Sequence, residues 1–423
     1  MRVLIVNTSE HTGGAAIAAA RLREALGNNG VKATMLVNHK ETETITVAET
    51  PRSRTRAKLD FLLERIAVWK ANRFRHHRLF EADAATYGTD ITSLKDFRQA
   101  DIVHLHWINQ GFLSIKSIAQ ILKSGKPVVW TMHDMWPFTG ICHYNGDCDR
   151  FKDKCGKCQL LYGGGSANDL SRRVFRRKQK LYRDANITFV ACSDWLAECA
   201  RSSALLEGKR VLSIPNTINT RLYSPSNSSK ARETLALPQG KKLLLFAAYR
   251  VTSKIKGIDY LCEAMDILAK QHPDLTSNIA VVAVGKESEA LKEMLPVKVY
   301  SFGYVSNESK MISIYNACNL FLIPTMQDNL PNTVMESMSC GIPCVAFNVG
   351  GIPQMIDHKI NGYVAEYRNA ADFAEGILWS LKGSNAAMLA EAARNKVVST
   401  FSETAVARRY SELYNSLAGG KDE

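Results

Sequence analysis

The sequence predicts an α/β protein with two doubly wound domains, each built on a parallel sheet. Short apolar runs of strand length alternate with runs of helical length in both halves of the chain. The 423 residues suffice for two domains of roughly 200 residues each, and a hydrophobic fraction of 46% can supply two cores. No internal repeat or low-complexity linker interrupts this pattern.

The first domain opens with a strand, a glycine loop and a helix. The strand RVLIVN leads into Thr12-Gly13-Gly14, and an alanine-rich helical run precedes the strand at residues 32–37. Adjacent glycines such as Gly13 and Gly14 let a ligand approach the backbone. The loop lacks the GxGxxG spacing of dinucleotide-binding proteins, so a tight turn without a ligand explains it equally well.

Two further strands of this domain carry histidines. His104 and His106 lie in the run DIVHLHW and share one face, because side chains alternate along a strand. His133 ends the run PVVWTMH, at the edge where open parallel sheets bind ligands. From the residues alone, a structural role is the commoner one for each of these histidines.

The second domain carries a basic loop after the strand KLLLFAAYR, which ends at Arg250. Arg250 and Lys256 are expected at the carboxyl edge of this sheet, and Lys254 can replace either of them. Together these side chains offer positive charge to an anionic ligand. A basic loop that only faces solvent is the alternative.

A helix start is predicted at the same edge. The apolar run NLFLIP at residues 319–324 indicates a buried strand, and a helix is expected to begin after Pro331. Backbone N–H groups near Asn332, Thr333 and Val334, together with the positive end of the helix dipole, suit a diphosphate.

Two carboxylates flank this turn, and either can reach sugar hydroxyls. Asp328 lies in the loop, and Glu336 lies one turn into the helix. For Glu336 the alternative is a capping box with Thr333, in which the carboxylate bonds back to the start of the helix. The turn Gly350-Gly351-Ile352-Pro353 after the next strand favours the binding role.

The stretch from Pro324 to Ile356 resembles the family 4 retaining glycosyltransferases of the GT-B fold. In that family an acidic residue, seven others and a glutamate follow one another; Asp328 and Glu336 have this spacing and precede SMSCGIPCVAFNVGGIPQMI. The first acid is Asp where the family usually has Glu. The resemblance covers nearly the whole chain and is greatest to the bacterial capsule and exopolysaccharide branch.

The resemblance implies two Rossmann-like domains that face a cleft, with a C-terminal helix that crosses back to the first domain. The expected limits are residues 1–208 for the acceptor-binding domain, 209–395 for the nucleotide-sugar-binding domain and 396–423 for the C-terminal helix. The segment PNTIN, with Thr217 and Asn219 in place of the family's glycine and aspartate, begins the second domain.

The implied reaction moves a sugar from a nucleotide diphosphate sugar to an acceptor hydroxyl with retention of configuration. It needs no metal or other cofactor, and it serves polysaccharide or lipid-linked glycan assembly. Two alternatives stay open, and the changes at Asp328, Thr217 and Asn219 favour the second of them. One is a nucleotide-sugar epimerase of the same fold, and the other is a non-catalytic scaffold that binds nucleotide sugar.

The resemblance also implies individual roles. Arg250 and Lys256 bind the donor phosphates, Glu336 the ribose hydroxyls, Asp328 the donor sugar, and His133 a sugar hydroxyl. The other expected donor contacts are Gly13, Gly14, Lys254, Gly303, Tyr304, Val305, Asn329, Leu330, Pro331, Asn332, Thr333 and Val334.

Four cysteines form a separate cluster in ICHYNGDCDRFKDKCGKC. Cys142, Cys148, Cys155 and Cys158 match a structural zinc site in number and nearly in spacing, although the first pair is wider than the common one. His143 is a further candidate ligand. Free thiols in a loop are the alternative.

The net charge of +13 is unevenly distributed. Basic residues far outnumber acidic ones between Pro51 and Phe80, with apolar side chains interleaved, and a second basic run begins at Ser171. Such segments suit an anionic membrane surface. Nucleic acid is the rival partner, but no nucleic-acid motif accompanies the charge, and a helix that only faces solvent is the third interpretation.

Composition favours a cytoplasmic enzyme that is at most peripheral on the inner face of the membrane. The chain opens directly on a strand without a signal peptide, and no run approaches the roughly 18 apolar residues of a spanning helix. The ten cysteines are expected to be mostly reduced thiols rather than a disulfide framework.

Overall fold

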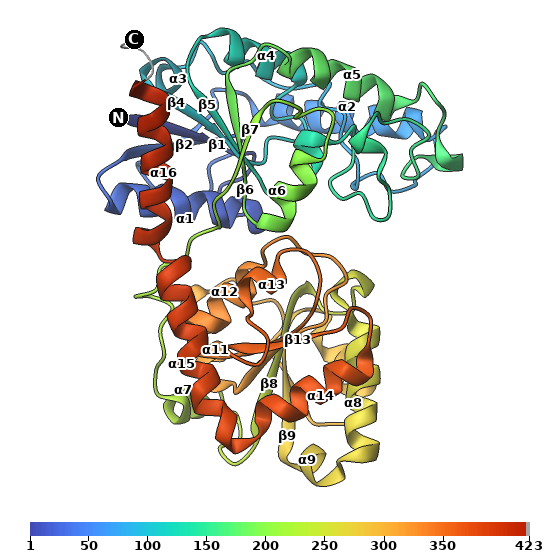
Figure 1. Ribbon diagram of the computed structural model, residues 1–423, viewed down its shortest axis with the longest axis vertical. Coiled ribbons are helices and arrows are strands. Elements are labelled where there is room, and N and C mark those ends of the chain that lie inside the picture. Colours follow the sequence, from blue (N-terminus) through green and yellow to red (C-terminus); the bar gives the residue numbers. More distant parts are fainter. Residues whose placement is uncertain (420–423) are drawn as a thin grey trace. The chain divides into compact units, whose positions relative to one another are not determined.

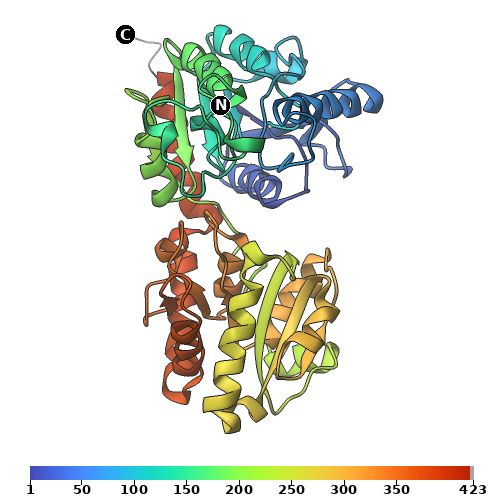
Figure 2. The same ribbon diagram turned by 90° about the vertical axis from the view of Figure 1, so that its right-hand side faces the viewer.

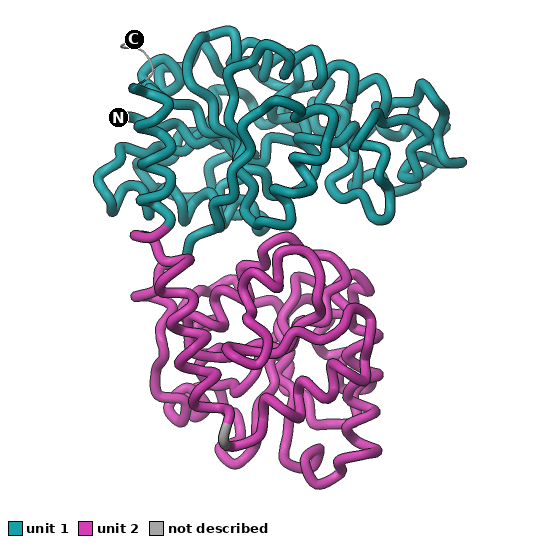
Figure 3. Tube along the Cα trace, viewed as in Figure 1, with its two compact units in different colours: residues 1–217, 406–423 teal, residues 218–405 magenta. Residues whose placement is uncertain are grey.

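The computed structural model describes residues 1–383 and 385–419, and it divides into two compact units (Figure 1, Figure 3). Unit 1 contains Met1–Thr217 and the chain from Val406 onward, and unit 2 contains Ile218–Ala405. Each unit holds one parallel sheet with helices on both faces.

Unit 1 is built on a seven-stranded sheet in the order β3-β2-β1-β4-β5-β6-β7. Its strands are β1 Arg2–Val6, β2 Lys32–Val37, β3 Val47–Glu49, β4 Ile102–Leu105, β5 Val128–Met132, β6 Ile187–Ala191 and β7 Arg210–Ser213. Its helices are α1 Gly14–Asn28, α2 Arg54–Ala71, α3 Lys95–Gln99, α4 Ile115–Lys123, α5 Leu170–Tyr182, α6 Asp194–Arg201 and α16 Glu403–Ala418. Short 3-10 turns are η1 Trp136–Phe138, η2 Arg150–Lys152 and η3 Tyr162–Gly164.

The two faces of this sheet bury alternate side chains of the same strands. In β1, Leu4 and Val6 belong to one core and Val3 and Ile5 to the other, as the two-residue period of a strand requires. Helices α3 to α6 cover the first core, and α1 and α16 cover the second. Strands buried on both faces read as continuous apolar runs, which is why the sequence reveals them.

Unit 2 is built on a six-stranded sheet in the order β10-β9-β8-β11-β12-β13. Its strands are β8 Lys242–Arg250, β9 Ile279–Lys286, β10 Val299–Ser301, β11 Leu320–Ile323, β12 Cys344–Phe347 and β13 Gly362–Ala365. Its helices are α7 Ser228–Thr234, α8 Ile258–Gln271, α9 Pro273–Asn278, α10 Leu291–Met294, α11 Glu308–Ala317, α12 Asn332–Ser339, α13 Ile352–Met355, α14 Ala370–Leu381 and α15 Gly383–Thr400, with the turns η4 Lys254–Lys256 and η5 Ser288–Ala290. Helices α8 and α14 pack together over one core of this unit, and α12 packs against α15 (Figure 1, Figure 2).

Both sheets reverse their strand order at one place. The order turns between β1 and β4 in unit 1 and between β8 and β11 in unit 2. In open parallel sheets, ligands bind outside the carboxyl ends of the strands at such a switch point. The loops that leave β8 and β11 are the basic and acidic loops singled out in the sequence.

The limits of the units differ from the expected domain limits. A boundary between residues 208 and 209 precedes β7, yet β7 pairs with β6 through Thr188 and Arg210, so unit 1 continues to Thr217. The expected C-terminal segment 396–423 begins inside α15, which lies in unit 2. The return to unit 1 is made by α16, and residues 420–423 lie outside the described residues.

Candidate active site

The backbone ties the basic and acidic loops of unit 2 together. The amide of Met326 donates to the carbonyl of Ile255 at 2.8 Å, and the hydroxyl of Thr325 donates to the same carbonyl at 3.1 Å. Gly257 has a φ of +78°, and a Cβ there would lie 1.7 Å from the carbonyl oxygen of Pro324. Only glycine permits this approach, which brings η4 against the end of β11.

This approach places Lys256 beside Asp328. The Lys256 ammonium donates to Oδ2 of Asp328 at 2.7 Å, and Oδ1 accepts from the amide of Asn329 at 3.1 Å. The loop is held from the other side as well, because a Cβ on Gly350 would lie 1.8 Å from the Asp328 carbonyl oxygen. The two residues predicted to contact phosphate and sugar are therefore direct neighbours.

The other two predicted cations have separate partners. Nε of Arg250 lies 3.4 Å from Oε1 of Glu287, at the adjoining ends of β8 and β9. Lys254 lies 3.8 Å from Asp259 in the first turn of α8, and its side chain is 86% exposed. The structure thus brings Lys256, rather than Lys254, to the acidic loop.

Helix α12 begins at Asn332, where a helix start was expected. Pro331 is its N-cap residue and provides no side-chain cap. The predicted alternative for Glu336, a capping box with Thr333, is wrong. In its place, Oε2 of Glu336 accepts from the hydroxyl of Tyr315 in α11 at 2.8 Å, and Glu336 is buried.

The remaining residues of the acidic loop differ in burial. Asn329 and Leu330 are buried, and Val334 packs in the interior. Thr333 is half-buried. This loop therefore presents mainly backbone and the Asp328 side chain.

The predicted residues Gly303, Tyr304 and Val305 follow β10. The amide of Gly303 donates to the hydroxyl of Ser288 at 3.1 Å, and its carbonyl accepts from Gly285 at 2.8 Å. Tyr304 is 57% exposed, and its ring meets that of Tyr249 edge to face at 5.6 Å. An exposed aromatic pair therefore stands at this edge of the sheet.

Sequence reasoning missed Tyr249, Lys286, Glu287 and Tyr315. The ammonium of Lys286 lies 2.6 Å from the hydroxyl of Tyr249 and 4.5 Å from the centre of its ring. Both residues stand at strand ends, next to Arg250 or Glu287, and that position could have identified them. No local pattern marks Tyr315.

In unit 1, Gly13 and Gly14 lie at the start of α1. Gly13 has a φ of +93°, and a Cβ on it would meet nothing within 4 Å. The turn that precedes it is fixed by buried Glu10, whose Oε2 accepts from the amides of Glu41 at 2.6 Å and Thr42 at 3.0 Å. The glycine loop is thus held in place while its surface stays open.

His133 belongs to a chain of three histidines at the carboxyl edge of unit 1. Nε2 of His133 and Nδ1 of His106 are 2.9 Å apart, and their rings stack with centres 5.2 Å apart. Nε2 of His104 hydrogen-bonds Thr131 at 2.7 Å, and its Nδ1 hydrogen-bonds Tyr414 of α16 at 2.7 Å. His104 therefore anchors the C-terminal helix, whereas His133 is half-buried at the strand end.

Burial keeps these histidines neutral. It lowers the pKa of His104 to about 3 and that of His133 to about 4, in the latter against the opposing effect of Asp134. The pKa of His106 is also well below its ordinary value because of burial and its two histidine neighbours. At neutral pH these three histidines offer hydrogen-bonding groups without charge.

The cysteine cluster lies in the long connection between β5 and α5. Cys142, Cys148, Cys155 and Cys158 line one small cavity. As they stand, no three His, Cys, Asp or Glu side chains among residues 1–383 and 385–419 are arranged to hold a metal ion. His143 instead donates through Nδ1 to Oδ2 of Asp134 at 2.7 Å, and this carboxylate raises the pKa of His143 against the effect of burial.

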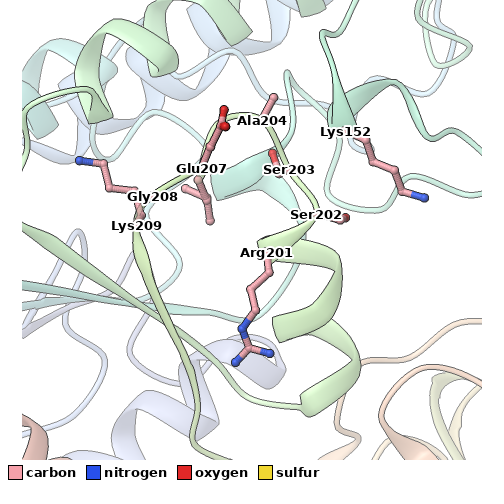
Figure 4. A pocket seen from close by; sticks show the side chains of 9 residues that line it. Lys152, Arg201, Ser202, Ser203, Ala204, Glu207, Gly208 and Lys209 are labelled. Carbon is pink, nitrogen blue, oxygen red and sulfur yellow. The ribbon is translucent and has the colours of Figure 1, made fainter.

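A larger hollow of about 490 Å³ lies elsewhere on unit 1 and contains none of the predicted residues (Figure 4). Its cations already have partners. Arg201 donates to the carbonyl of Val211 at 3.0 Å, Lys209 to those of Arg183 and Ala185, and Lys152 pairs with Asp149 at 2.9 Å. The hollow is therefore a weaker candidate for a ligand site than the carboxyl edge of the unit 2 sheet.

Two sequence profiles of known families match the chain. The profile described as Glycosyltransferase Family 4 matches residues 12–222, and the one described as Glycosyl transferases group 1 matches residues 227–396. The first match covers most of unit 1, and the second covers most of unit 2, including the whole basic and acidic edge.

Curated relatives match shorter parts of the chain. An uncharacterized glycosyltransferase of Haemophilus influenzae is 32% identical over 125 residues, which are 29% of this chain and 35% of the relative. The putative colanic acid biosynthesis glycosyl transferase WcaC of Escherichia coli is 25% identical over 256 residues, 58% of this chain and 59% of the relative. The chain thus spans between about one third and three fifths of the length of these two relatives.

Solved structures show the same fold. The crystal structure of Anabaena HepE in complex with UDP-glucose superposes with a TM-score of 0.63 at 17% identity, over 98% of this chain and all of that one. The predicted fold class of two Rossmann-like parts is confirmed. Because the two profiles together account for residues 12–396 apart from four between them, the chain belongs to the family 4, or group 1, glycosyltransferases.

Proposed function

We propose that this protein is a retaining glycosyltransferase that moves a sugar from a nucleotide diphosphate sugar to an acceptor hydroxyl. The observation that carries the proposal is the Lys256–Asp328 pair, which stands between β8 and β11 next to the start of α12. A cation, a carboxylate and a helix N-terminus meet there at the switch point of a parallel sheet, where a diphosphate and a sugar can bind side by side.

The leaving diphosphate gains negative charge as the glycosidic bond breaks, and residues of unit 2 would stabilise it. The Lys256 ammonium has three N–H donors, so it can bind a phosphate oxygen while it still pairs with Asp328. Arg250 adds a second charge, and α12 adds the positive end of its dipole. Such preorganised charges supply the electrostatic role that other folds assign to a divalent cation.

The nucleoside would lie along the carboxyl ends of β8, β9 and β10. Glu336 is suited to the ribose hydroxyls because Tyr315 fixes one of its carboxylate oxygens in place. Tyr304 and Tyr249 offer exposed rings on which a base can stack. This assignment gives the expected donor contacts Gly303, Tyr304 and Val305 a place beside the base.

Within unit 2, Asp328 is suited to the hydroxyls of the donor sugar. Within unit 1, the neutral His133 is suited to a sugar hydroxyl, and the open glycine loop at Gly13 and Gly14 is suited to a phosphate. A neutral imidazole can hydrogen-bond a hydroxyl as donor or acceptor without attracting the phosphates. We assign no general base, because in a retaining reaction of this kind the leaving phosphate can accept the proton of the acceptor.

The test combines donor binding with donor turnover. Thermal unfolding is measured with UDP, GDP, ADP and CDP, each with a chelator, because a ligand that binds the native state stabilises it by mass action. We expect one diphosphate to raise the melting temperature. The matching nucleotide sugar is then incubated with the protein and a glycan acceptor, and we expect a glycosylated acceptor and free diphosphate.

The other outcomes identify the alternatives. A free sugar epimer without transfer indicates the epimerase. Binding of a diphosphate without any turnover indicates the scaffold. No shift with any of the four nucleotides would overturn donor binding altogether.

We further propose that the acceptor is a lipid-linked glycan and that α2 lies on an anionic membrane. No helix in the described part of the chain has both the length and the apolar composition to cross a membrane. Helix α2 instead turns its two acidic residues inward: Asp60 pairs with Arg52, and Glu64 accepts from the amides of Ala84 and Thr86. Its acidic groups are therefore hidden.

The outer surface of this segment is apolar and basic. Phe74 is 61% exposed and Phe80 is 64% exposed, and Leu59, Phe61 and Leu62 are exposed beside them. The exposed cations among them are Arg54, Arg56, Lys58, Lys70, Arg73, Arg75 and Arg78. Each cation near an anionic surface contributes about 1 kcal/mol, and apolar burial adds to it.

Vesicle binding tests this surface. We expect the protein to sediment with vesicles of phosphatidylcholine and phosphatidylglycerol and to stay in solution with phosphatidylcholine alone. The variant Leu62→Ser with Phe74→Ser should bind weakly, whereas Ile360→Ser, an exposed apolar residue of unit 2, should bind normally. Equal binding of both variants contradicts the proposal.

A further inference from the structure

We propose that Cys142, Cys148, Cys155 and Cys158 form a structural zinc site with four thiolate ligands, which holds the long connection between β5 and α5. This inference does not depend on the proposed function. It rests on the cavity that these side chains share, on the backbone around their sulfurs, and on a buried cation beside them.

The cavity has the size of a single ion. All four cysteines line it, and its volume is about 20 Å³. A space of that size holds about one particle as large as a water molecule. None of the four cysteines is in a disulfide, and Cys155 is buried. Rotation of the thiols about their Cα–Cβ bonds is needed to direct all four at one point, since they do not yet have coordinating geometry.

The backbone packs closely around the sulfurs. Burial raises the pKa of the Cys155 and Cys158 thiols, and backbone hydrogen bonds from Gly140, Leu160 and Leu161 oppose this shift only in part. A metal that binds here therefore has to displace the thiol protons. Gly140 allows close packing here, because a Cβ on it would lie 3.1 Å from Cβ of Cys155.

The turn between the last two cysteines is also specialised. In the segment Cys155-Gly156-Lys157-Cys158, Gly156 has a φ of +139° and Lys157 a φ of +48°. A Cβ on Gly156 would lie 2.9 Å from the carbonyl oxygen of Ala167. A tight turn of this kind brings two cysteines to the same side, as a short chelating pair requires.

Lys178 of α5 supplies a buried positive charge. It belongs to the basic run that begins at Ser171, yet its side chain is 0% exposed. Its ammonium donates to the carbonyls of Trp136 and Thr139, the latter at 3.1 Å, and it forms no ion pair with a carboxylate in the described part of the chain. Burial lowers the pKa of Lys178 to about 7, and the nearby Cys142 and Cys155 oppose that shift.

The buried Lys178 cation would compensate charge at a metal centre. Zinc with four thiolates carries a net charge of about −2, which is costly to bury without a compensating charge. The Lys178 ammonium, which the Trp136 and Thr139 carbonyls hold beside the cluster, would offset part of that charge. A metal cross-link would also stabilise the connection between β5 and α5, because the 3-10 turns η1, η2 and η3 are the only regular elements in residues 133–169.

The decisive measurement is metal content and coordination of the whole protein. Protein purified in reducing buffer is incubated with zinc chloride, desalted and analysed for zinc by mass spectrometry and X-ray absorption. We expect about one zinc ion per chain, with four sulfur neighbours at about 2.3 Å. The variants Cys148→Ser and Cys158→Ser should lose it. Cys199→Ser, a half-buried thiol of α6 outside the cluster, should keep it.

A second readout covers variants that fail to fold. Cobalt added to the reduced wild-type protein should give the intense sulfur-to-metal absorption and visible bands of a tetrahedral thiolate site. A wild-type protein that binds neither zinc nor cobalt overturns the proposal and leaves four neutral thiols. Metal that remains in both cysteine variants overturns it as well.

Discussion

The two sheets have the same strand order up to the sixth strand, but their ligand edges differ in charge. At the edge of unit 2, Lys256 pairs with Asp328 and Arg250 with Glu287, all partly open to solvent. At the edge of unit 1, His106 and His133 hydrogen-bond each other as neutral groups. The same topology therefore carries exposed ion pairs at one edge and neutral histidines at the other, and the side chains rather than the fold decide which.

The largest expected effect comes from removing the positive charge of Lys256 at the carboxyl edge of the unit 2 sheet. Lys256→Ala should lower kcat by about 100-fold or more, because a preorganised cation at the leaving group is lost. The melting temperature should change little, since a partly exposed ion pair contributes about 0.2–1 kcal/mol. Lys254→Ala is the matched control and should keep most of its activity. Similar rates in the two variants would contradict the role of Lys256.

The two glycine loops provide a comparison of backbone strain. Gly257→Ala should destabilise unit 2 by about 2 kcal/mol or more, because its Cβ would overlap the Pro324 carbonyl. Gly13→Ala should cost about 1–3 kcal/mol from backbone strain alone, because its φ of +93° with ψ of 162° strains alanine although the added Cβ meets open space. Urea unfolding measures both. If Gly13→Ala is stable yet no longer binds the nucleotide sugar, the methyl group occupies space that the donor needs.

Acid should weaken unit 1 through its neutral histidines. Burial lowers the pKa of His104 to about 3 and of His133 to about 4 in the folded state. Above the ordinary pKa of about 6.5 both states are neutral, so stability is then complete. As pH falls below that value, only the unfolded chain takes up these protons, and stability drops by up to about 1.4 kcal/mol per pH unit for each histidine.

The measurement is urea unfolding between pH 7.5 and pH 5. His104→Gln should reduce the slope of the unfolding free energy against pH by up to about 1.4 kcal/mol per pH unit, which corresponds to one proton. This change in slope is expected whatever the effect of the substitution on absolute stability. The exposed His76→Asn should leave the slope unchanged. An unchanged slope in His104→Gln would show that this histidine does not remain neutral in the folded protein.

The smallest effect is expected at the aromatic pair. Tyr304→Ala should weaken binding of the preferred nucleoside diphosphate by about 5- to 50-fold, a loss typical of a base stacked on an aromatic ring. Tyr304→Phe should restore binding. Isothermal titration distinguishes stacking from the phosphate contacts, because the loss should be the same for the nucleoside monophosphate and diphosphate.

Local patterns predicted most of the fold. Buried parallel strands are continuous apolar runs, so β1, β8 and β11 were evident from the sequence, and Pro331 marked the start of α12. The resemblance named Lys256 and Asp328, and the structure shows why they meet: Gly257 lets their loops touch.

Long-range contacts account for what could not be predicted. The partner of Glu336 is Tyr315, which lies 21 residues earlier on another helix, so the nearby Thr333 suggested a capping box that does not form. Lys178 sits in a run of arginines and lysines, and only the packing of α5 buries it. Strand β7 is short and partly exposed, so the chain gave no sign that unit 1 continues beyond residue 208.

The return of the chain in α16 has a consequence for synthesis. His104 meets Tyr414 across 310 residues, and Thr131 meets Tyr410 across 279. While the ribosome makes the chain, His104 and Thr131 can bond each other but lack their partners Tyr414 and Tyr410 until α16 emerges. Unit 2 is continuous and can fold before α16 emerges. Unit 1 is therefore translated first but completes its fold after unit 2.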